Sequence, residues 1–506
     1  MTDDYIERIL KARVYDVAIE SPLELAPRLS RRVNNQVLFK REDLQPVFSF
    51  KLRGAYNKIA HLSDSVAKRG VICASAGNHA QGVALAAQRR GIPATVVMPQ
   101  TTPSIKVSAV RSLGGEVVLH GDDYDSAFEH AQSIVRERNL AFVHPFDDPD
   151  VIAGQGTIAV EILRQSRGDV DAIFVPVGGG GLIAGIAIYA KFLNPKIRII
   201  GVEPVDAAAM HDSLHAKKRV VLERVGIFAD GVAVKKVGEE TFRLCREHVD
   251  EVVLVDTDEI CAGIQDIFED TRSIVEGAGA LAVAGLKKYC AMNQWKDKRV
   301  VAVNSGANMN FDQLRYVAER SDLGQAREAL LAVEIPEKPG SFLRFLEILG
   351  SRAVTEFNYR FGKKERAQIF VGFGLSRGKE ERDEVVAALK AAGYGVTDMT
   401  DNEIAKLHVR YMVGGHVNGS VGNERLFRFE FPERKGALLA FLQAIGTRWN
   451  ITLFHYRNHG SDYGRVLAGI DVPPSDMPDF LDHLNVLHFS YSDETNNPVY
   501  RIFLGS

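Results

Sequence analysis

The chain has 506 residues, more than one hydrophobic core organises, and its length indicates about three domains. Hydrophobic residues make up 46% and charged residues 25%, which is typical of a globular protein in water. The net charge of −3 does not suggest a nucleic-acid binder, and no apolar run reaches the length of a membrane span. The acidic first residues lack the basic-then-apolar order of a secretory signal. Four widely spaced cysteines without CxxC pairs favour neither a metal site nor disulfides, so we expect a cytoplasmic protein without a bound metal.

The first unusual stretch is VFSFKLRGAYNK, residues 47–58, which places Lys51 among aromatic and apolar neighbours. Lysine is one of the residues least often buried. An isolated lysine in such a segment typically packs its stem and keeps its ammonium in water. The alternative is an amine held in a pocket, where it can form a Schiff base with a carbonyl cofactor. This stretch alone is compatible with both interpretations.

Short apolar runs alternate with longer helical patterns over roughly the first 320 residues. We predict buried strands in the apolar runs of GVICASAGNH, ATVVMP, EVVLHG, AIFVPVGGGG, RIIGVEP and RVVAVNSGAN, which alternate with helical segments such as AQGVALAAQRRG. This alternation predicts βαβ units and an α/β domain with a mostly parallel sheet. Ligands bind beyond the carboxyl ends of such strands, where the chain carries three unusual segments: Ser75 to His79, Gly178 to Gly181 and Ser305 to Asn308.

The segment SAGNHAQG, residues 75–82, brings a hydroxyl, an amide and an imidazole to a junction between a strand and a helix. The free N–H groups of a helix start suit a carboxylate or a cofactor oxygen. The alternative is an ordinary cap, with Ser75 or Asn78 bonding the first turn. By itself, His79 is more typical of a structural hydrogen bond than of catalysis.

The glycine run in VPVGGGGLIAG follows an apolar strand and precedes a helix. Glycines let the backbone approach a phosphate, which the helix N-terminal amides then bind. The same residues also satisfy G-x-G-x-x-A at Gly179, Gly181 and Ala184, with Glu203 about twenty residues later, as a dinucleotide fingerprint requires. Phosphate binding is therefore favoured, and an NAD-dependent dehydrogenase is the competing function.

Two further segments carry single polar groups. NSGAN offers the hydroxyl of Ser305 at a strand end, where the alternative is a glycine turn with a capping serine. SIVEGAGALAVAGL places Glu276 before a helix of small residues, where a carboxylate is usually just favourable with the helix dipole.

The pattern changes after residue 330, where two segments repeat each other. Pro336 in EIPEKPG matches Pro432 in EFPERKG, and TEFNYR ending at Arg360 matches TLFHYR ending at Arg457. Each copy is predicted to contain a strand, a P-x-x-x-G turn, an amphipathic helix and a second strand. Two copies are too few for a solenoid, so paired α+β modules are expected, joined by a glycine-rich connector.

Taken together and in this order, SFKLRGA, SAGNHAQG, VGGGGL and NSGAN resemble the fold-type II pyridoxal-phosphate enzymes, in particular the threonine and serine dehydratases. The duplicated tail is similar to the ACT-like regulatory domains of the biosynthetic threonine dehydratases. The resemblance implies a pyridoxal 5'-phosphate-dependent catalytic domain at residues 1–322 and ACT-like domains at 330–401 and 425–497.

The resemblance also implies roles for individual residues. Lys51 would be catalytic and would bind the cofactor covalently, with further cofactor contacts from Asn78, Gly178, Gly179, Gly180, Gly181, Leu182 and Ser305. The substrate would contact Ser75, Gly77, Asn78 and His79. The effector would contact Phe357, Tyr359, Arg360, His455, Tyr456 and Arg457, although aromatic residues in a strand are more often core.

The implied reaction is the deamination of L-threonine to 2-oxobutanoate and ammonia, the first committed step of isoleucine biosynthesis. L-serine stays open as a second substrate. Isoleucine would act as feedback inhibitor with valine as a candidate opposing effector, and the resembled family implies a homotetramer.

Overall fold

The computed structural model describes residues 2–336, 345, 347–350, 352, 354–359, 366–411, 423–432, 448–457, 463–486 and 489–504. The chain divides into two compact units, Met1–Val317 and Ala318–Ser506. The predicted boundary at residue 322 falls within helix α14 (Gln313–Gly324), whose Leu323 joins the core of the second unit.

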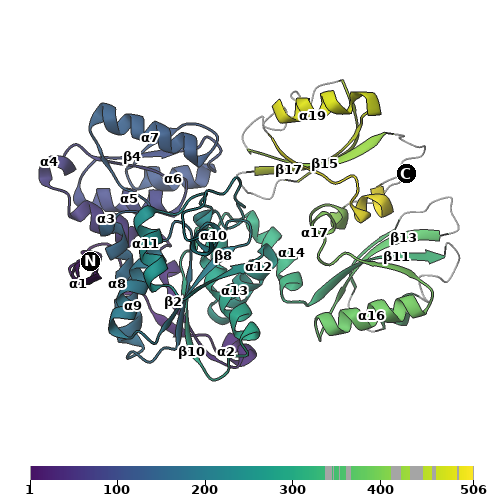
Figure 1. Ribbon diagram of the computed structural model, residues 1–506, viewed down its shortest axis with the longest axis horizontal. Helices are drawn as coiled ribbons and strands as arrows, with labels where there is room; N and C mark the ends of the chain where they lie inside the picture. Colours follow the sequence, from purple (N-terminus) through teal and green to yellow (C-terminus); the bar gives the residue numbers. More distant parts are fainter. Residues whose placement is uncertain are drawn as a thin grey trace. The chain divides into compact units, whose positions relative to one another are not determined.

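The first unit contains a six-stranded sheet whose neighbouring strands are parallel except at one edge (Figure 1). Its order is β1 (Leu23–Leu25), β2 (Gln36–Arg41), β10 (Arg299–Asn304), β7 (Ala172–Pro176), β8 (Arg198–Pro204) and β9 (Glu251–Val255). The central strands are buried along nearly their whole length because helices cover both faces, which explains their continuous apolar runs. The predicted strands at β7, β8 and β10 are confirmed, whereas β2 and β9 were not predicted.

The same unit contains a second, four-stranded parallel sheet, so the α/β prediction is right but the single sheet is two. Alternate residues of its strands face opposite layers: Val71 and Cys73 pack with helix α5 (Asn78–Arg90), and Ile72 and Ala74 pack with α7 (Tyr124–Arg138). The strand order is β5 (Glu116–Leu119), β4 (Ala94–Met98), β3 (Val71–Ala74) and β6 (Ala141–Phe142).

Helices connect the strands of both sheets. Within the described residues, none combines the length and the hydropathy needed to span a membrane. The remaining helices of this unit are α1 (Thr2–Leu10), α2 (Pro27–Val33), η1 (Glu42–Leu44), α3 (Lys51–Ala60), α4 (Asp64–Ala67), α6 (Ser104–Ser112), α8 (Pro149–Gln165), α9 (Gly181–Leu193), α10 (Ala209–Ala216), η2 (Asp230–Val232), α11 (Glu239–His248), α12 (Thr257–Thr271) and α13 (Gly277–Met292).

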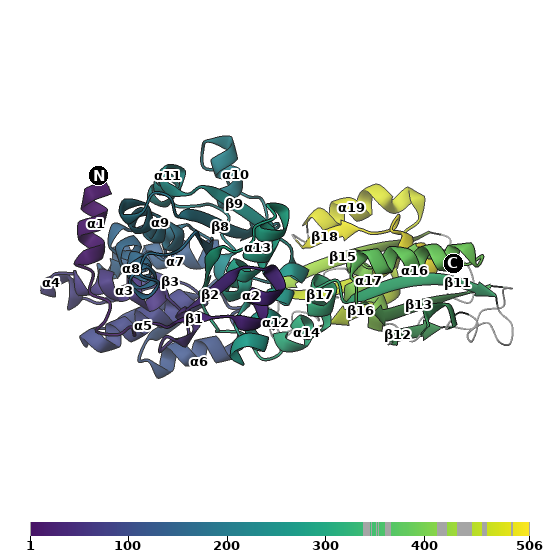
Figure 2. The same cartoon turned by 90° about the horizontal axis from the view of Figure 1, so that it is seen from below.

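The second unit contains two four-stranded antiparallel sheets with the same strand order, which confirms the tandem α+β prediction. Helix α16 (Lys379–Ala391) accompanies the first sheet and α19 (Met477–Val486) the second (Figure 2). The predicted helices after the P-x-x-x-G turns lie largely outside the described residues. The first sheet has the order β12 (Val354–Tyr359), β13 (Arg366–Gly374), β11 (Glu328–Pro336) and β14 (Gly395–Asp398), and the second β16 (Asn450–Arg457), β17 (Tyr463–Asp471), β15 (Glu424–Pro432) and β18 (Ser490–Asp493).

The two sheets of the second unit share one buried cluster. Leu330 and Phe370 of the first sheet pack in the same cluster as Leu426 and Leu467 of the second, together with residues of α17 (Glu403–Leu407) and of the C-terminal η5 (Tyr500–Leu504). The two modules therefore share part of their hydrophobic core.

Candidate active site

One cavity in the first unit collects all eight of the predicted cofactor residues. Strands β7 and β10 end at this cavity, and helices α3 and α5 begin there. This position agrees with the expectation that ligands bind beyond the carboxyl ends of parallel strands. Its walls also include side chains that sequence analysis did not assign to a cofactor. The lining residues are Phe50, Lys51, Asn78, Phe146, Pro176, Gly178, Gly179, Gly180, Gly181, Leu182, Gly231, Val232, Glu276, Ala278 and Ser305.

Lys51 is the first residue of α3, and its half-buried side chain reaches into the cavity. Its Nζ donates a hydrogen bond to the Pro145 carbonyl at 2.9 Å. Burial lowers the pKa of the amine from 10.5 to about 8, and the nearby Glu276 carboxylate opposes that shift. The structure therefore favours the pocket interpretation over a lysine with its ammonium in water.

The glycine loop is tightly wedged between other segments. A Cβ added at Gly179 would lie 2.2 Å from the Phe146 ring, so only glycine fits there. Gly180 has φ +97°, a conformation that residues with a side chain rarely adopt. The Thr241 hydroxyl donates to the Gly179 carbonyl at 2.6 Å and fixes the loop.

Two neighbouring helix starts differ in how their N–H groups are satisfied. The Asp147 carboxylate accepts from the backbone N–H groups of Glu239, Glu240 and Thr241, so it caps α11. No side chain of the described residues caps α9, which begins at Gly181. The start of α9 therefore keeps N–H groups for an anion inside the cavity.

Asn78 is held in one orientation by two partners. Its Nδ2 donates to Glu276 Oε1 at 2.5 Å, and its Oδ1 accepts from Asn308 Nδ2 at 2.6 Å. Glu276 is only 4% exposed, and burial raises the pKa of its carboxyl above the ordinary value. Glu276 thus lies in the cavity wall. The sequence pattern indicates only a carboxylate that interacts favourably with the helix dipole, so it does not predict this position.

The predicted substrate residues other than Asn78 surround the start of α5 without lining the cavity. The Ser75 hydroxyl accepts from the Gly77 N–H at 3.2 Å, and a Cβ at Gly77 would meet open space. The His79 ring nitrogen Nε2 lies 2.8 Å from the Val143 carbonyl, and burial lowers the pKa of this imidazole to about 3. His79 is therefore neutral at neutral pH, and the substrate role of this loop stays a prediction.

Ser305 and Glu203 separate the two functions considered above. The Ser305 hydroxyl donates to the Ala278 carbonyl at 3.2 Å in the cavity wall. Glu203 is fully buried, and its carboxylate accepts from the backbone N–H groups of Met210 and His211. A dinucleotide fingerprint needs this carboxylate for a ribose hydroxyl, so its engagement with α10 removes the support for a dehydrogenase.

The predicted effector residues belong to the second unit. Phe357 and Tyr359 lie on β12, and His455, Tyr456 and Arg457 lie on β16, which occupy the same edge position in their two sheets. Arg360 lies outside the described residues. The effector role of all six stays a prediction.

Comparison with known proteins covers nearly the whole chain. Residues 14–306 match the family model described as pyridoxal-phosphate dependent enzyme, and residues 319–409 and 416–504 match the C-terminal regulatory domain of threonine dehydratase. The chain is 56% identical to the L-threonine dehydratase biosynthetic IlvA of Burkholderia multivorans over 99% of both chains. It is 54% identical to the protein of that name from Escherichia coli, covering 99% of this chain and 97% of the relative.

Among solved structures, the processed form of threonine deaminase isoform 2 from Solanum lycopersicum is similar with a TM-score of 0.63 at 54% identity. The match covers 64% of this chain and 88% of that one.

Proposed function

The chain belongs to the pyridoxal-phosphate-dependent enzymes and, among them, to the biosynthetic threonine dehydratases. From this premise we propose roles for its residues and ligands. It is a lyase that converts L-threonine to 2-oxobutanoate and ammonia. L-serine is a second candidate substrate of the same site.

One observation carries the proposal: a desolvated lysine amine shares a cavity with an uncapped helix start that follows a glycine cradle. An aldehyde that bears a phosphate needs both groups, an amine for its carbonyl carbon and N–H groups for its anion. Lys51 would bind the aldehyde carbon, and residues 178–182 would hold the phosphate. Asn78 and Ser305 offer polar atoms for the ring between them, so the residues present fit the cofactor.

When bound, pyridoxal phosphate supplies an electron sink for the negative charge that develops at the substrate α-carbon. The chain supplies the proton transfers. Burial lowers the pKa of the Lys51 amine to about 8, which increases the fraction of neutral amine that can take the α-proton and then return a proton to the leaving hydroxyl. The Ser305 hydroxyl cannot hold a ring nitrogen protonated as a carboxylate does, which favours elimination over transamination.

The substrate carboxylate is assigned to the loop from Ser75 to Asn78. This loop precedes α5, whose start no described side chain caps. The open space beside Gly77 leaves room for a ligand there. Backbone N–H groups at this helix start would bind the carboxylate and orient the α-hydrogen toward Lys51.

The second unit is assigned to control. Isoleucine is the proposed feedback inhibitor and valine a candidate opposing effector, with sites along β12 and β16. The cluster shared by the two modules supports communication between them. A cytoplasmic homotetramer is the proposed form, and the four buried free cysteines are compatible with a reducing compartment.

The test is 2-oxobutanoate release from threonine by the purified protein, with and without isoleucine. Turnover that isoleucine suppresses supports both assignments. Turnover without suppression would leave the lyase and refute the control by isoleucine, and absence of turnover would refute the proposed substrate.

A further inference from the structure

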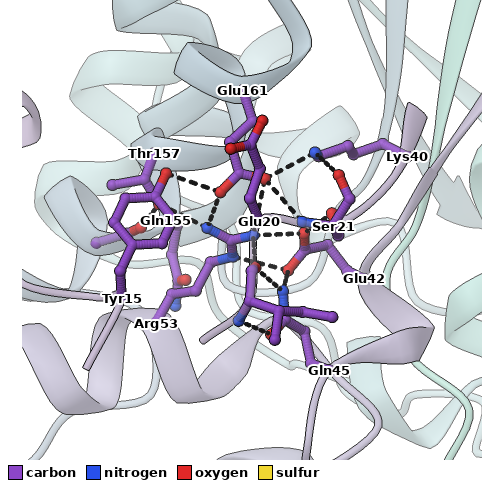
Figure 3. Close-up of polar contacts among 12 residues, drawn as sticks. Tyr15, Glu20, Ser21, Lys40, Glu42, Gln45, Arg53, Gln155, Thr157 and Glu161 are labelled. Atoms are coloured by element: carbon purple, nitrogen blue, oxygen red, sulfur yellow. Dashed lines mark hydrogen bonds and ion pairs between the residues drawn. The ribbon is translucent and has the colours of Figure 1, made fainter. Parts of the chain in front are cut away.

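Arg53, two residues after Lys51, extends its guanidinium into a buried network of charges (Figure 3). Its Nε and Nη2 each donate to a Glu42 oxygen at 2.8 Å, and its Nη1 and Nη2 donate to the Glu161 oxygens at 2.6 and 3.0 Å. Thr157 Oγ1 and the Ile19 carbonyl accept at 3.1 and 3.2 Å. All five N–H directions of the guanidinium therefore have acceptors.

A second cation completes the network. Lys40 Nζ lies 2.7 Å from Glu161 Oε2 and donates to the Ser21 carbonyl at 2.6 Å. The side chains of Arg53, Lys40, Glu42 and Glu161, here called the charge tetrad, are fully buried. Two positive and two negative charges sum to zero, so the tetrad places no net charge in the interior.

Each member of the tetrad comes from a different element. Arg53 lies on α3, Glu161 on α8, Glu42 on η1 and Lys40 on β2. The tetrad therefore ties the first turn of α3 to the consecutive segments β2 and η1, which precede it in the sequence, and to α8, about a hundred residues further on. Tyr15, from the segment before β1, also donates to Glu161 at 2.8 Å.

The first turn of α3 is also anchored by packing, because Leu52 is fully buried and the Gly54 N–H donates to Gln155 Oε1 at 3.2 Å. Its N-cap residue Phe50 makes no side-chain capping bond, although its backbone N–H donates to the Ser305 carbonyl at 3.2 Å. Residues two apart in a helix point in opposite directions. Arg53 accordingly reaches into the tetrad, while Lys51 reaches into the cavity on the other side of the same turn.

Close contact between α3 and α8 adjoins the tetrad. A Cβ at Gly54 would lie 2.4 Å from Gln155 Nε2, and a Cβ at Gly154 would lie 2.7 Å from the Gly54 Cα. Such close approach leaves little room for rotation of α3 as long as α3 and α8 stay in contact. The bonds from Arg53 to Glu161 hold these two helices together. A buried ion network often stabilises a protein no more than well-packed apolar residues would. A gain in stability therefore does not explain the tetrad, and the positions that it fixes are the better guide to its role.

We propose that the charge tetrad is a positioning device for Lys51, fixing the rotation and depth of the first turn of α3 so that the amine stays inside the cavity. The inference rests on the proposed role of Lys51 in the reaction. Arg53 and its partners are positioning residues, since they act on the chemistry only through Lys51.

The test compares Arg53→Lys with a matched control, Arg41→Lys. Lysine keeps the charge but cannot donate to two carboxylates in a fixed fork. Arg41 is likewise buried and bonds Asp43, but it lies on β2 and not on α3. The readouts are kcat and KM for threonine, the melting temperature, and the pKa of Lys51 in the cofactor-free chain, measured by competitive labelling with an amine reagent across pH.

We expect Arg53→Lys to lower kcat at least tenfold with a KM change under twofold, and to move the labelling pKa of Lys51 from about 8 toward 10.5. Arg41→Lys should lower the melting temperature without either effect. If Arg53→Lys does not fold, Glu161→Gln gives the same readouts. Burial already lowers the pKa of Lys40, so that amine can release its proton and keep the network neutral.

Equal losses of melting temperature in Arg53→Lys and Arg41→Lys, with kcat and the Lys51 pKa unchanged in both, would overturn the proposal and leave the tetrad a stabilising feature only. Failure of the proposed function is seen separately. A wild-type enzyme that releases no 2-oxobutanoate refutes that function, whereas the labelling pKa still compares the position of Lys51 in the variants.

Discussion

Replacing Lys51 by methionine should stabilise the cofactor-free protein at neutral pH. Burial lowers the pKa of this amine from 10.5 to about 8, so the folded state penalises the ammonium form. The unfolded chain binds a proton at Lys51 up to pH 10.5, whereas the folded chain releases it above about pH 8. The penalty is therefore complete below about pH 8, shrinks as the pH rises, and vanishes above pH 10.5.

The size of the effect follows from the two pKa values. Their difference of about 2.5 corresponds to about 3 kcal/mol. Methionine also loses the hydrogen bond from Nζ to the Pro145 carbonyl, worth about 1 kcal/mol. The net gain in the free energy of unfolding at pH 7 is therefore about 2 kcal/mol, and at pH 10 the variant and wild type should agree within about 1 kcal/mol.

Urea unfolding of both cofactor-free proteins at pH 7 and pH 10 measures this difference. Lys58→Met on the same helix is the control, because Lys58 pairs with Asp148 at 2.8 Å and has a raised pKa, the carboxylate outweighing desolvation. That variant should be less stable than wild type. A Lys51→Met variant that is also less stable at pH 7 would refute the claim that the amine is desolvated.

Three further predictions follow from the cavity and the second unit. Gly179→Ala places a methyl group 2.2 Å from the Phe146 ring and should weaken cofactor binding at least tenfold, measured by absorbance titration of the cofactor-free enzyme; unchanged affinity would contradict the cradle. Glu276→Gln removes a carboxylate that raises the pKa of Lys51, so competitive labelling should place that pKa below about 8, and a higher value would contradict the contact. A chain ending at Val317 should keep threonine turnover and lose inhibition by isoleucine, and inhibition that persists in steady-state kinetics would place the effector in the first unit.

The strands and their ends were predictable because the signal is local. Continuous Val/Ile runs identify β7, β8 and β10, and the residues that follow parallel strands must meet at one edge. This geometry brings the glycine loop and Ser305 into one cavity, although they are more than a hundred residues apart. The pattern did not reveal that the strands form two sheets, because strand pairing depends on contacts between distant segments.

The supporting side chains could not be predicted from the sequence. Phe146 has no motif of its own and matters only because its ring fills the space beside Gly179. In the sequence, Glu276 cannot be distinguished from any other carboxylate before a helix. Only the structure shows that it accepts a hydrogen bond from Asn78. Arg53 lies only two residues after Lys51 in the sequence, but its partner Glu161 comes 108 residues later on α8.

The most direct test of the central claim is borohydride reduction of the holoenzyme, followed by digestion and mass analysis of the peptides. The account predicts that the reduced cofactor is found on the peptide that contains Lys51, with Lys58 unmodified. A cofactor mass on another lysine, or on none, would contradict the assignment of Lys51 on which the site, the mechanism and the role of the charge tetrad depend.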